Sequence, residues 1–132
     1  MKVVDTTFLI GLLRNDPGAV EKARELDGEG GAATTAINVY EVAYGIHRAL
    51  SNSGRRMKDF ERLLSNLDVL PLDQGSALRA AGISGSLGRR GEGIDPFDSL
   101  IAGIALESGA DALVTKNISH FRRIRGLNIE GH

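Results

Sequence analysis

Three carboxylates are the residues of this sequence with the clearest potential for chemistry. Asp5 directly follows a strand-like run, and Glu41 and Asp98 lie shortly after the helix-start signals at Asn38 and Asp95. Three carboxylates in one small pocket repel one another, so a fold that gathers them normally holds a hard cation with oxygen ligands, here Mg²⁺ or Mn²⁺. Such an ion binds phosphate oxygens and lowers the pKa of a bound water. The expected reaction is hydrolysis of a phosphodiester bond.

The predicted topology explains how residues so far apart in sequence can meet. Thr115-Lys116-Asn117 follows one predicted strand just as Asp5 follows another. Ligands of open α/β sheets bind beyond the carboxyl ends of the strands. Right-handed β-α-β connections bring the amino ends of helices to that same edge. We therefore expect Asp5, Glu41, Asp98 and Asn117 to converge there.

Each carboxylate also has a purely structural explanation. Asp5 precedes an apolar helical run and could be its N-cap. Glu41 lies three residues after Asn38 and could complete a capping box with it. Asp98 could stabilise the positive end of its own helix. Asp95 is better explained as the N-cap of that helix, and we leave it outside the proposed site.

The elements that must position these residues alternate between strand-like and helical patterns. This alternation predicts an α/β fold of one domain, with a mostly parallel sheet of about four to five strands flanked by helices. Strands are expected over residues 3–4, 33–35, 69–72, 112–115 and 127–129. Helices are expected over residues 8–13, 19–26, 39–50, 57–67, 74–87 and 96–108. Residues 88–93 are expected to form a flexible loop.

Composition excludes several classes of protein. With 132 residues, 42% hydrophobic and 25% charged, the sequence has ordinary globular composition. The absence of cysteine rules out disulfides and thiolate metal sites and fits a cytoplasmic protein. No apolar stretch approaches the roughly 20 residues of a membrane span. The net charge of −1 gives no global signal for nucleic acid, although basic residues cluster over 55–58, 89–90 and 122–125.

Four segments resemble the PIN-domain family, and specifically its VapC-like toxins: residues 4–10, 37–45, 94–105 and 113–121. No single motif is specific, but all four occur in the family's order and spacing. The resemblance implies a PIN-like domain with Asp5, Glu41 and Asp98 as acidic metal ligands, and Thr6 and Thr115 lining the site. It also implies an endoribonuclease, usually a homodimer, restrained by a cognate antitoxin in a groove near the active site.

One position departs from the broader family. Where many PIN domains have a fourth acid after the last strand, this sequence has Asn117, a neutral amide and a poorer ligand for a hard cation. The neutral amide therefore weakens the case for a second metal position. Arg89, Arg90 and Lys116 are the candidates for RNA contact, because we expect them near the acidic edge.

Other functions fit the sequence less well. A haloacid-dehalogenase phosphatase needs a second Asp two residues after the first, where this sequence has Thr7. A receiver-like signalling domain needs an adjacent pair of acids near its first strand, and that pair is missing. A non-catalytic PIN-fold protein that binds RNA or an assembly partner has no need for a costly carboxylate cluster. Cleavage of RNA with and without a chelator would separate the catalytic and non-catalytic alternatives.

Overall fold

The computed structural model describes residues 1–132 and contains a single five-stranded sheet in which all strands are parallel. The strand order is β3-β2-β1-β4-β5, so the chain first builds one half of the sheet outward from β1 and then the other half. The predicted α/β fold and strand number are confirmed, and the sheet is wholly rather than mostly parallel. The strands are β1 (Lys2–Val4), β2 (Ala32–Thr35), β3 (Asp68–Leu70), β4 (Ala112–Val114) and β5 (Ile129–Glu130).

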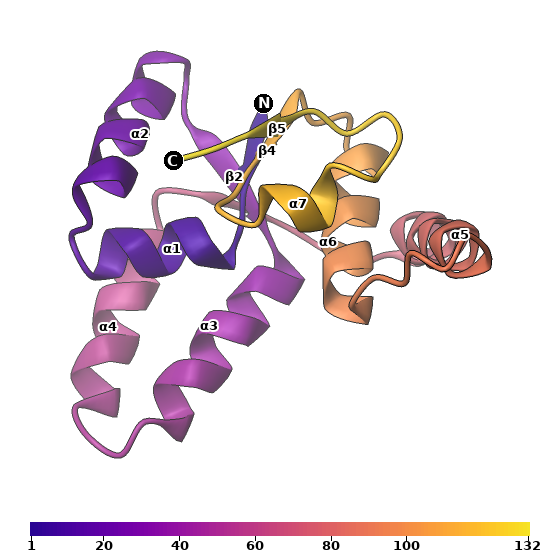
Figure 1. The fold of residues 1–132 in the computed structure, drawn as a ribbon. Helices are drawn as coiled ribbons and strands as arrows, with labels where there is room; N and C mark the ends of the chain where they lie inside the picture. Colours follow the sequence, from indigo (N-terminus) through magenta and orange to yellow (C-terminus); the bar gives the residue numbers. More distant parts are fainter.

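Seven helices connect these strands, because parallel neighbours need crossover connections. In Figure 1 the helices α3 and α4 extend together away from the sheet, and α5 lies at the side of the molecule beyond α6. None of the helices combines the length and apolarity needed to span a bilayer. The helices are α1 (Thr6–Leu13), α2 (Pro17–Gly28), α3 (Ala36–Arg48), α4 (Ser53–Leu64), α5 (Gln74–Arg89), α6 (Pro96–Glu107) and α7 (Ile118–Phe121).

The sheet has a hydrophobic core on each face. Side chains of adjacent strand residues point to opposite faces, so Val3 joins one core and Val4 the other, and both are fully buried. The Val3 side is completed by residues of α5, α6 and α7, and the Val4 side by residues of α1 to α4. Burial on both faces is the usual condition of a parallel sheet. The strand ends are thereby held rigidly between two packed layers.

The close approach of α5 and α6 fixes the helix that bears Asp98. A β-carbon on Gly103 of α6 would lie 2.6 Å from the backbone oxygen of Ser76 and 2.9 Å from the β-carbon of Ala80. Glycine is thus required where the two helices touch. The α5 helix also continues to Arg89, so the predicted loop at 88–93 is wrong for its first two residues.

Other boundaries differ from the sequence prediction at element ends. The α3 helix begins at Ala36, earlier than predicted, because Thr35 rather than Asn38 is its N-cap. The strand β3 ends at Leu70, and Pro71 follows directly, as expected for a proline at the end of an edge strand. The short helix α7 was not predicted.

Candidate active site

The two central strands, β1 and β4, form the point where the strand order reverses, and this is where open α/β sheets bind ligands. Asp5 directly follows β1, and Thr115 directly follows β4. The Asp5 N–H donates to the Val114 carbonyl at 3.2 Å, which extends the pairing of the two strands by one residue. The Thr115 hydroxyl donates to Asp5 Oδ2 at 2.5 Å. Both side chains are buried, and the predicted meeting of these two strand ends is confirmed.

Asp5 is also the N-cap of α1, so its structural and chemical explanations hold together. Its Oδ1 accepts from the Thr7 N–H at 3.0 Å, the Thr7 hydroxyl at 2.6 Å and the Phe8 N–H at 3.3 Å. Burial raises the pKa of Asp5, and the hydrogen bonds from Thr115, Thr7 and the Phe8 N–H oppose that rise. The result is a carboxylate fixed in one orientation at the switch point of the sheet.

Glu41 reaches the site from the second turn of α3. The Thr6 hydroxyl donates to Glu41 Oε1 at 2.7 Å, and Asn38 Nδ2 donates to the Thr6 hydroxyl at 3.0 Å. Burial raises the pKa of Glu41, the Thr6 hydrogen bond opposes this, and repulsion from Asp98, Asp5 and Asp95 adds to the rise. Thr6, expected to line the site, therefore bridges two side chains of α3.

The capping box predicted for Asn38 and Glu41 is wrong. The N-cap is Thr35, whose hydroxyl accepts from the Asn38 N–H at 3.1 Å and donates to Asn38 Oδ1 at 2.7 Å. Asn38 itself is fully buried in the first turn of α3. Sequence reasoning missed its role, although the Thr35-to-Asn38 spacing at the end of a strand was a signal for this alternative cap.

Asp98 comes from the first turn of α6, at the third helical position, as predicted. Asp95 is confirmed as the N-cap, since its Oδ1 accepts from the Phe97 N–H at 2.8 Å. Asp98 Oδ2 lies 3.2 Å from Nδ1 of His120, a residue of α7 that sequence reasoning did not single out. Burial raises the pKa of Asp98, the contact with His120 opposes the rise, and repulsion from Asp95 adds to it.

In Figure 1 the strands run toward the centre of the molecule, where α1, α3, α6 and α7 surround their carboxyl ends. The acids there influence one another: Asp5 and Asp98 both raise the pKa of Glu41, and Asp5 raises that of Asp98. No lysine or arginine forms an ion pair with Asp5, Glu41 or Asp98, and the one imidazole in contact with them is that of His120, beside Asp98. The negative charge of the cluster is therefore largely uncompensated by the protein.

The three carboxylates do not form a closed metal cage. No three His, Asp or Glu side chains lie close enough together to make a group of metal ligands, and each carboxylate is held by its own partner. The donor set nevertheless fits a hard divalent cation, since Asp5 is buried, Glu41 and Asp98 are partly buried, and the three carboxylates repel one another and have no lysine or arginine partner. Asn117 directly precedes α7, and its N–H donates to the Thr115 hydroxyl at 2.9 Å.

A second histidine lies beside this site without having been predicted. His132 Nε2 is 3.2 Å from the Thr7 hydroxyl, and its ring packs edge-on against Phe8 with the ring centres 5.3 Å apart. Burial lowers the pKa of His132, and the negative charge of Asp5 opposes this. His132 therefore contacts Thr7, which is hydrogen-bonded to Asp5, and forms no hydrogen bond with Asp5 itself.

The three residues expected to contact RNA occupy different surroundings. Lys116 is half exposed, and its Nζ lies 3.9 Å from the Asp16 carboxylate. Arg89 is the last residue of α5 and is exposed. Arg90 lies 3.5 Å from Glu92 and borders a cavity between α5 and the segment that follows α7. Only Lys116 belongs to the segment that leads directly from Thr115.

The comparisons with known proteins agree with this geometry. The family model described as "PIN domain" matches residues 2–127. The chain is 30% identical over 128 residues to the tRNA(fMet)-specific endonuclease VapC of Shigella flexneri, covering 97% of this chain and 95% of that protein. A relative of the same description from Salmonella typhimurium is also 30% identical over 128 residues, with the same coverage.

Solved structures of VapBC complexes contain chains with the same fold. The crystal structure of DNA-bound VapBC from Salmonella typhimurium contains a chain that is 30% identical, with a TM-score of 0.87 over 98% of this chain and 96% of that one. VapBC2 from Rickettsia felis is 23% identical and has a TM-score of 0.88 over 99% and 98% of the two chains, which supports the fold. The chain therefore belongs to the PIN-domain family, as a VapC-like endonuclease.

Proposed function

We propose that this protein is a metal-dependent endoribonuclease and the toxin of a toxin–antitoxin pair, with Asp5, Glu41 and Asp98 as the ligands of Mg²⁺ or Mn²⁺. The observation that carries the proposal is the carboxylate cluster at the switch point of the sheet. Asp5 is buried and Glu41 and Asp98 are partly buried; the three acids repel one another and have no lysine or arginine partner. A scaffold without catalysis gains nothing from such a cluster, whereas a divalent cation compensates its charge.

Several residues around the carboxylates have distinct roles in the proposed reaction. When bound, the cation supplies Lewis-acid activation of water and of the phosphate. Thr115 and Thr7 orient Asp5 through hydrogen bonds to both of its oxygens, and Thr6 orients Glu41. His120 contacts Asp98 through Nδ1 and so helps to orient that carboxylate. Asn117 stays a peripheral candidate, because its amide oxygen is a weak ligand for a hard cation.

The substrate class follows from the relatives. Proteins 30% identical to this chain over nearly its whole length are described as tRNA(fMet)-specific endonucleases. We propose transfer RNA as the substrate, and initiator tRNA is the first molecule to test. The non-catalytic alternative, a PIN-fold protein that binds RNA or an assembly partner, remains the competing function in that test.

The test is cleavage of initiator tRNA with Mg²⁺ or Mn²⁺ and again with a chelator. We expect cleavage only with the cation, leaving a 5′-phosphate, because an activated water attacks in line and expels the 3′-oxygen. Asp5→Asn is the matched inactive variant, since Asn caps a helix as well as Asp does. Fragments that end in a 2′,3′-cyclic phosphate would contradict the mechanism, and binding without any cleavage would favour the non-catalytic alternative.

A cognate antitoxin has a candidate binding groove beside the site. Relatives of the same fold have been solved as a toxin–antitoxin complex from Klebsiella pneumoniae and as VapBC complexes. A cavity of about 340 Å³ opens between α1, α3 and α4. Its lining is partly apolar, and Glu41 forms part of it, so a segment bound there would obstruct the carboxylate cluster. The lining residues are Ile10, Leu13, Arg14, Glu41, Val42, Gly45, Ile46, Arg56 and Asp59.

An exposed aromatic patch is formed by Tyr40 and Tyr44 of α3 together with Phe97 of α6. We propose that a second copy of this chain binds there to form a homodimer. Tyr40 stacks on Tyr44 with ring centres 6.0 Å apart and meets Phe97 edge-on at 5.7 Å, although about half of each tyrosine is exposed. Sedimentation of the chain alone, and of the chain with its antitoxin, would test both partners. A monomeric mass for the free chain, or cleavage undiminished in the complex, would contradict these proposals.

A further inference from the structure

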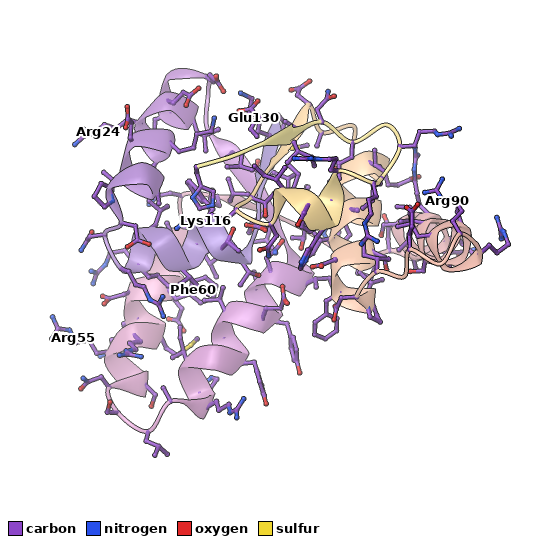
Figure 2. All side chains as sticks on the ribbon, in the orientation of Figure 1. Arg24, Arg55, Phe60, Arg90, Lys116 and Glu130 are labelled. Atoms are coloured by element: carbon purple, nitrogen blue, oxygen red, sulfur yellow. The ribbon has the colours of Figure 1, made fainter.

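The strongest unexplained feature of the molecule is an arginine-lined cavity between α5 and the segment that follows α7. It has a volume of about 600 Å³, a partly apolar lining and no acidic residue among the ten that line it. In Figure 2 Arg90 lies where α5 approaches the loop after α7. Five arginines from the two segments line this cavity: Arg79, Arg90, Arg122, Arg123 and Arg125.

The overall charge of the chain does not account for this concentration. The chain has 16 lysines and arginines, 17 acids and a net charge of −1, yet five of its basic residues line one cavity. Arg79 and Arg90 have loose ion pairs, at 3.3 Å to Glu107 and 3.5 Å to Glu92, and each of the four side chains is nearly half exposed. Exposed pairs of this kind contribute little to stability. Their guanidinium groups therefore stay available to a ligand.

The other three arginines have no carboxylate partner at all. Arg122 and Arg125 form no ion pair, and Arg123 donates only to the backbone oxygens of Glu92, at 2.6 Å, and Gly93, at 3.3 Å. The Nε of Arg123 is buried and has no hydrogen-bond partner. No carboxylate of the protein neutralises these three arginines, so the exposed Arg122 and Arg125 can pair with an anionic ligand.

The chemistry of such a ligand follows from the guanidinium group. Arginine presents a planar fork of donors that matches a phosphate, and several converging forks favour a ligand with more than one phosphate. The three apolar lining residues, Ile83, Leu87 and Ile124, can pack against the sugar or base of a nucleotide. A phosphodiester backbone satisfies both requirements.

Two short segments of the chain link residues at the cavity to residues at the carboxylate site. Arg122 and Arg123 directly follow α7, whose His120 contacts Asp98. Arg123 also fixes the backbone at Glu92 and Gly93, in the connection that leads to α6 and Asp98. A nucleic-acid strand that has one phosphate at Asp98 can therefore continue past α7 into the cavity.

We propose that this cavity binds backbone phosphates of the RNA on one side of the cleaved bond. The identity of the strand as RNA rests on the proposed function, whereas the phosphate chemistry rests on the cavity itself. The arginines hold nucleotides away from the carboxylates and so set the register of the strand. They act on substrate binding and take no part in bond cleavage.

The test uses single-stranded RNA of about twelve nucleotides and the full chain with the non-cleaving change Asp5→Asn. Adding Arg122→Gln and Arg125→Gln should weaken binding on the order of tenfold. The slope of log affinity against log salt should fall by about 1.4, since each lost contact to a single strand accounts for about 0.7. Arg24→Gln with Arg55→Gln is the matched control, because neither residue forms an ion pair and Figure 2 shows both on the opposite side of the molecule from Arg90.

A cleavage assay with Asp5 intact then separates this proposal from the proposed function. The cavity variant should raise KM for a long RNA far more than it lowers kcat, and the control should resemble the wild type. Wild-type cleavage combined with equal affinity and salt slope in the cavity and control variants would overturn the cavity proposal alone. A cavity variant that bound RNA normally but lost its antitoxin would also overturn it, in favour of an acidic protein partner. Absence of cleavage by the wild type would refute the proposed function and leave the binding result valid.

Discussion

Replacing Asp98 by asparagine is expected to abolish RNA cleavage while leaving the metal-free protein at least as stable as the wild type. A bound divalent cation provides several kcal/mol of transition-state stabilisation, and each 1.4 kcal/mol is about a tenfold change in rate. Losing one carboxylate ligand should therefore reduce cleavage by at least about a hundredfold. Single-turnover cleavage of the same tRNA by both proteins measures this.

The expected stability of the Asp98→Asn variant results from two opposing effects. Removing a negative charge from the first turn of α6 loses about 0.3–1 kcal/mol of favourable helix-end electrostatics. It also removes a carboxylate whose pKa is raised by burial and by repulsion from Asp95 and Asp5. A raised pKa means that the folded state disfavours the ionised form, so wild-type stability falls as pH rises from the unfolded value of about 4 through the folded value. The advantage of the variant should therefore grow between acidic and neutral pH.

Asp95→Asn is the matched control for this experiment. It removes the same charge from the same helix end, and Asn keeps the N-cap hydrogen bond to the Phe97 N–H. We expect this variant to retain cleavage, because Asp95 lies outside the proposed ligand set. Excess Mg²⁺ should raise the melting temperature of the wild type and of Asp95→Asn more than that of Asp98→Asn. An Asp98→Asn protein with the full Mg²⁺-induced shift, or with wild-type cleavage, would return Asp98 to the role of a helix-end charge.

The sequence predicts those parts of the site that follow from topology. Asp5 and Thr115 directly follow adjacent parallel strands, and the position of a residue after a strand is enough to locate it at the edge of the sheet. Asp98 follows from the strong helix start at Asp95 and Pro96. These predictions depend on local signals and on general rules of connection, both of which are present in a single sequence.

The rest of the site depends on contacts that a local pattern cannot specify. Thr35 and Asn38 are both suitable N-cap residues. Because β2 ends at Thr35, α3 begins directly after it, and Thr35 is the N-cap. His120 contacts Asp98 across 22 positions of the chain, through a four-residue helix with no periodicity to detect. The basic run at 122–125 was visible in the sequence, but its convergence with α5 arises only when α5 packs against α6. Tertiary packing therefore determines which polar residues meet.

Asn38→Ala is expected to weaken metal binding through Glu41 although Asn38 itself is not a proposed ligand. Asn38 is fully buried and links Thr35 to Thr6, and Thr6 holds Glu41. The substitution removes two hydrogen bonds, each contributing about 0.5–1.5 kcal/mol, so unfolding should become easier by about 1–3 kcal/mol. Loss of a residue that orients a metal ligand typically reduces metal affinity or activity by about 10–100-fold.

Titration of cleavage with Mg²⁺ distinguishes this positioning role from a merely structural one. In Asn38→Ala the Mg²⁺ concentration for half-maximal cleavage should rise, while KM for RNA changes little, because the loosened group is a metal ligand rather than a substrate contact. Thr6→Val should show the same rise without emptying the buried space at Asn38, and Thr6→Ser, which keeps the hydroxyl, should restore the wild-type requirement. Should Asn38→Ala and Thr6→Val lose activity only in proportion to the folded fraction, with an unchanged Mg²⁺ requirement, the link from Asn38 through Thr6 to Glu41 would have no part in metal binding.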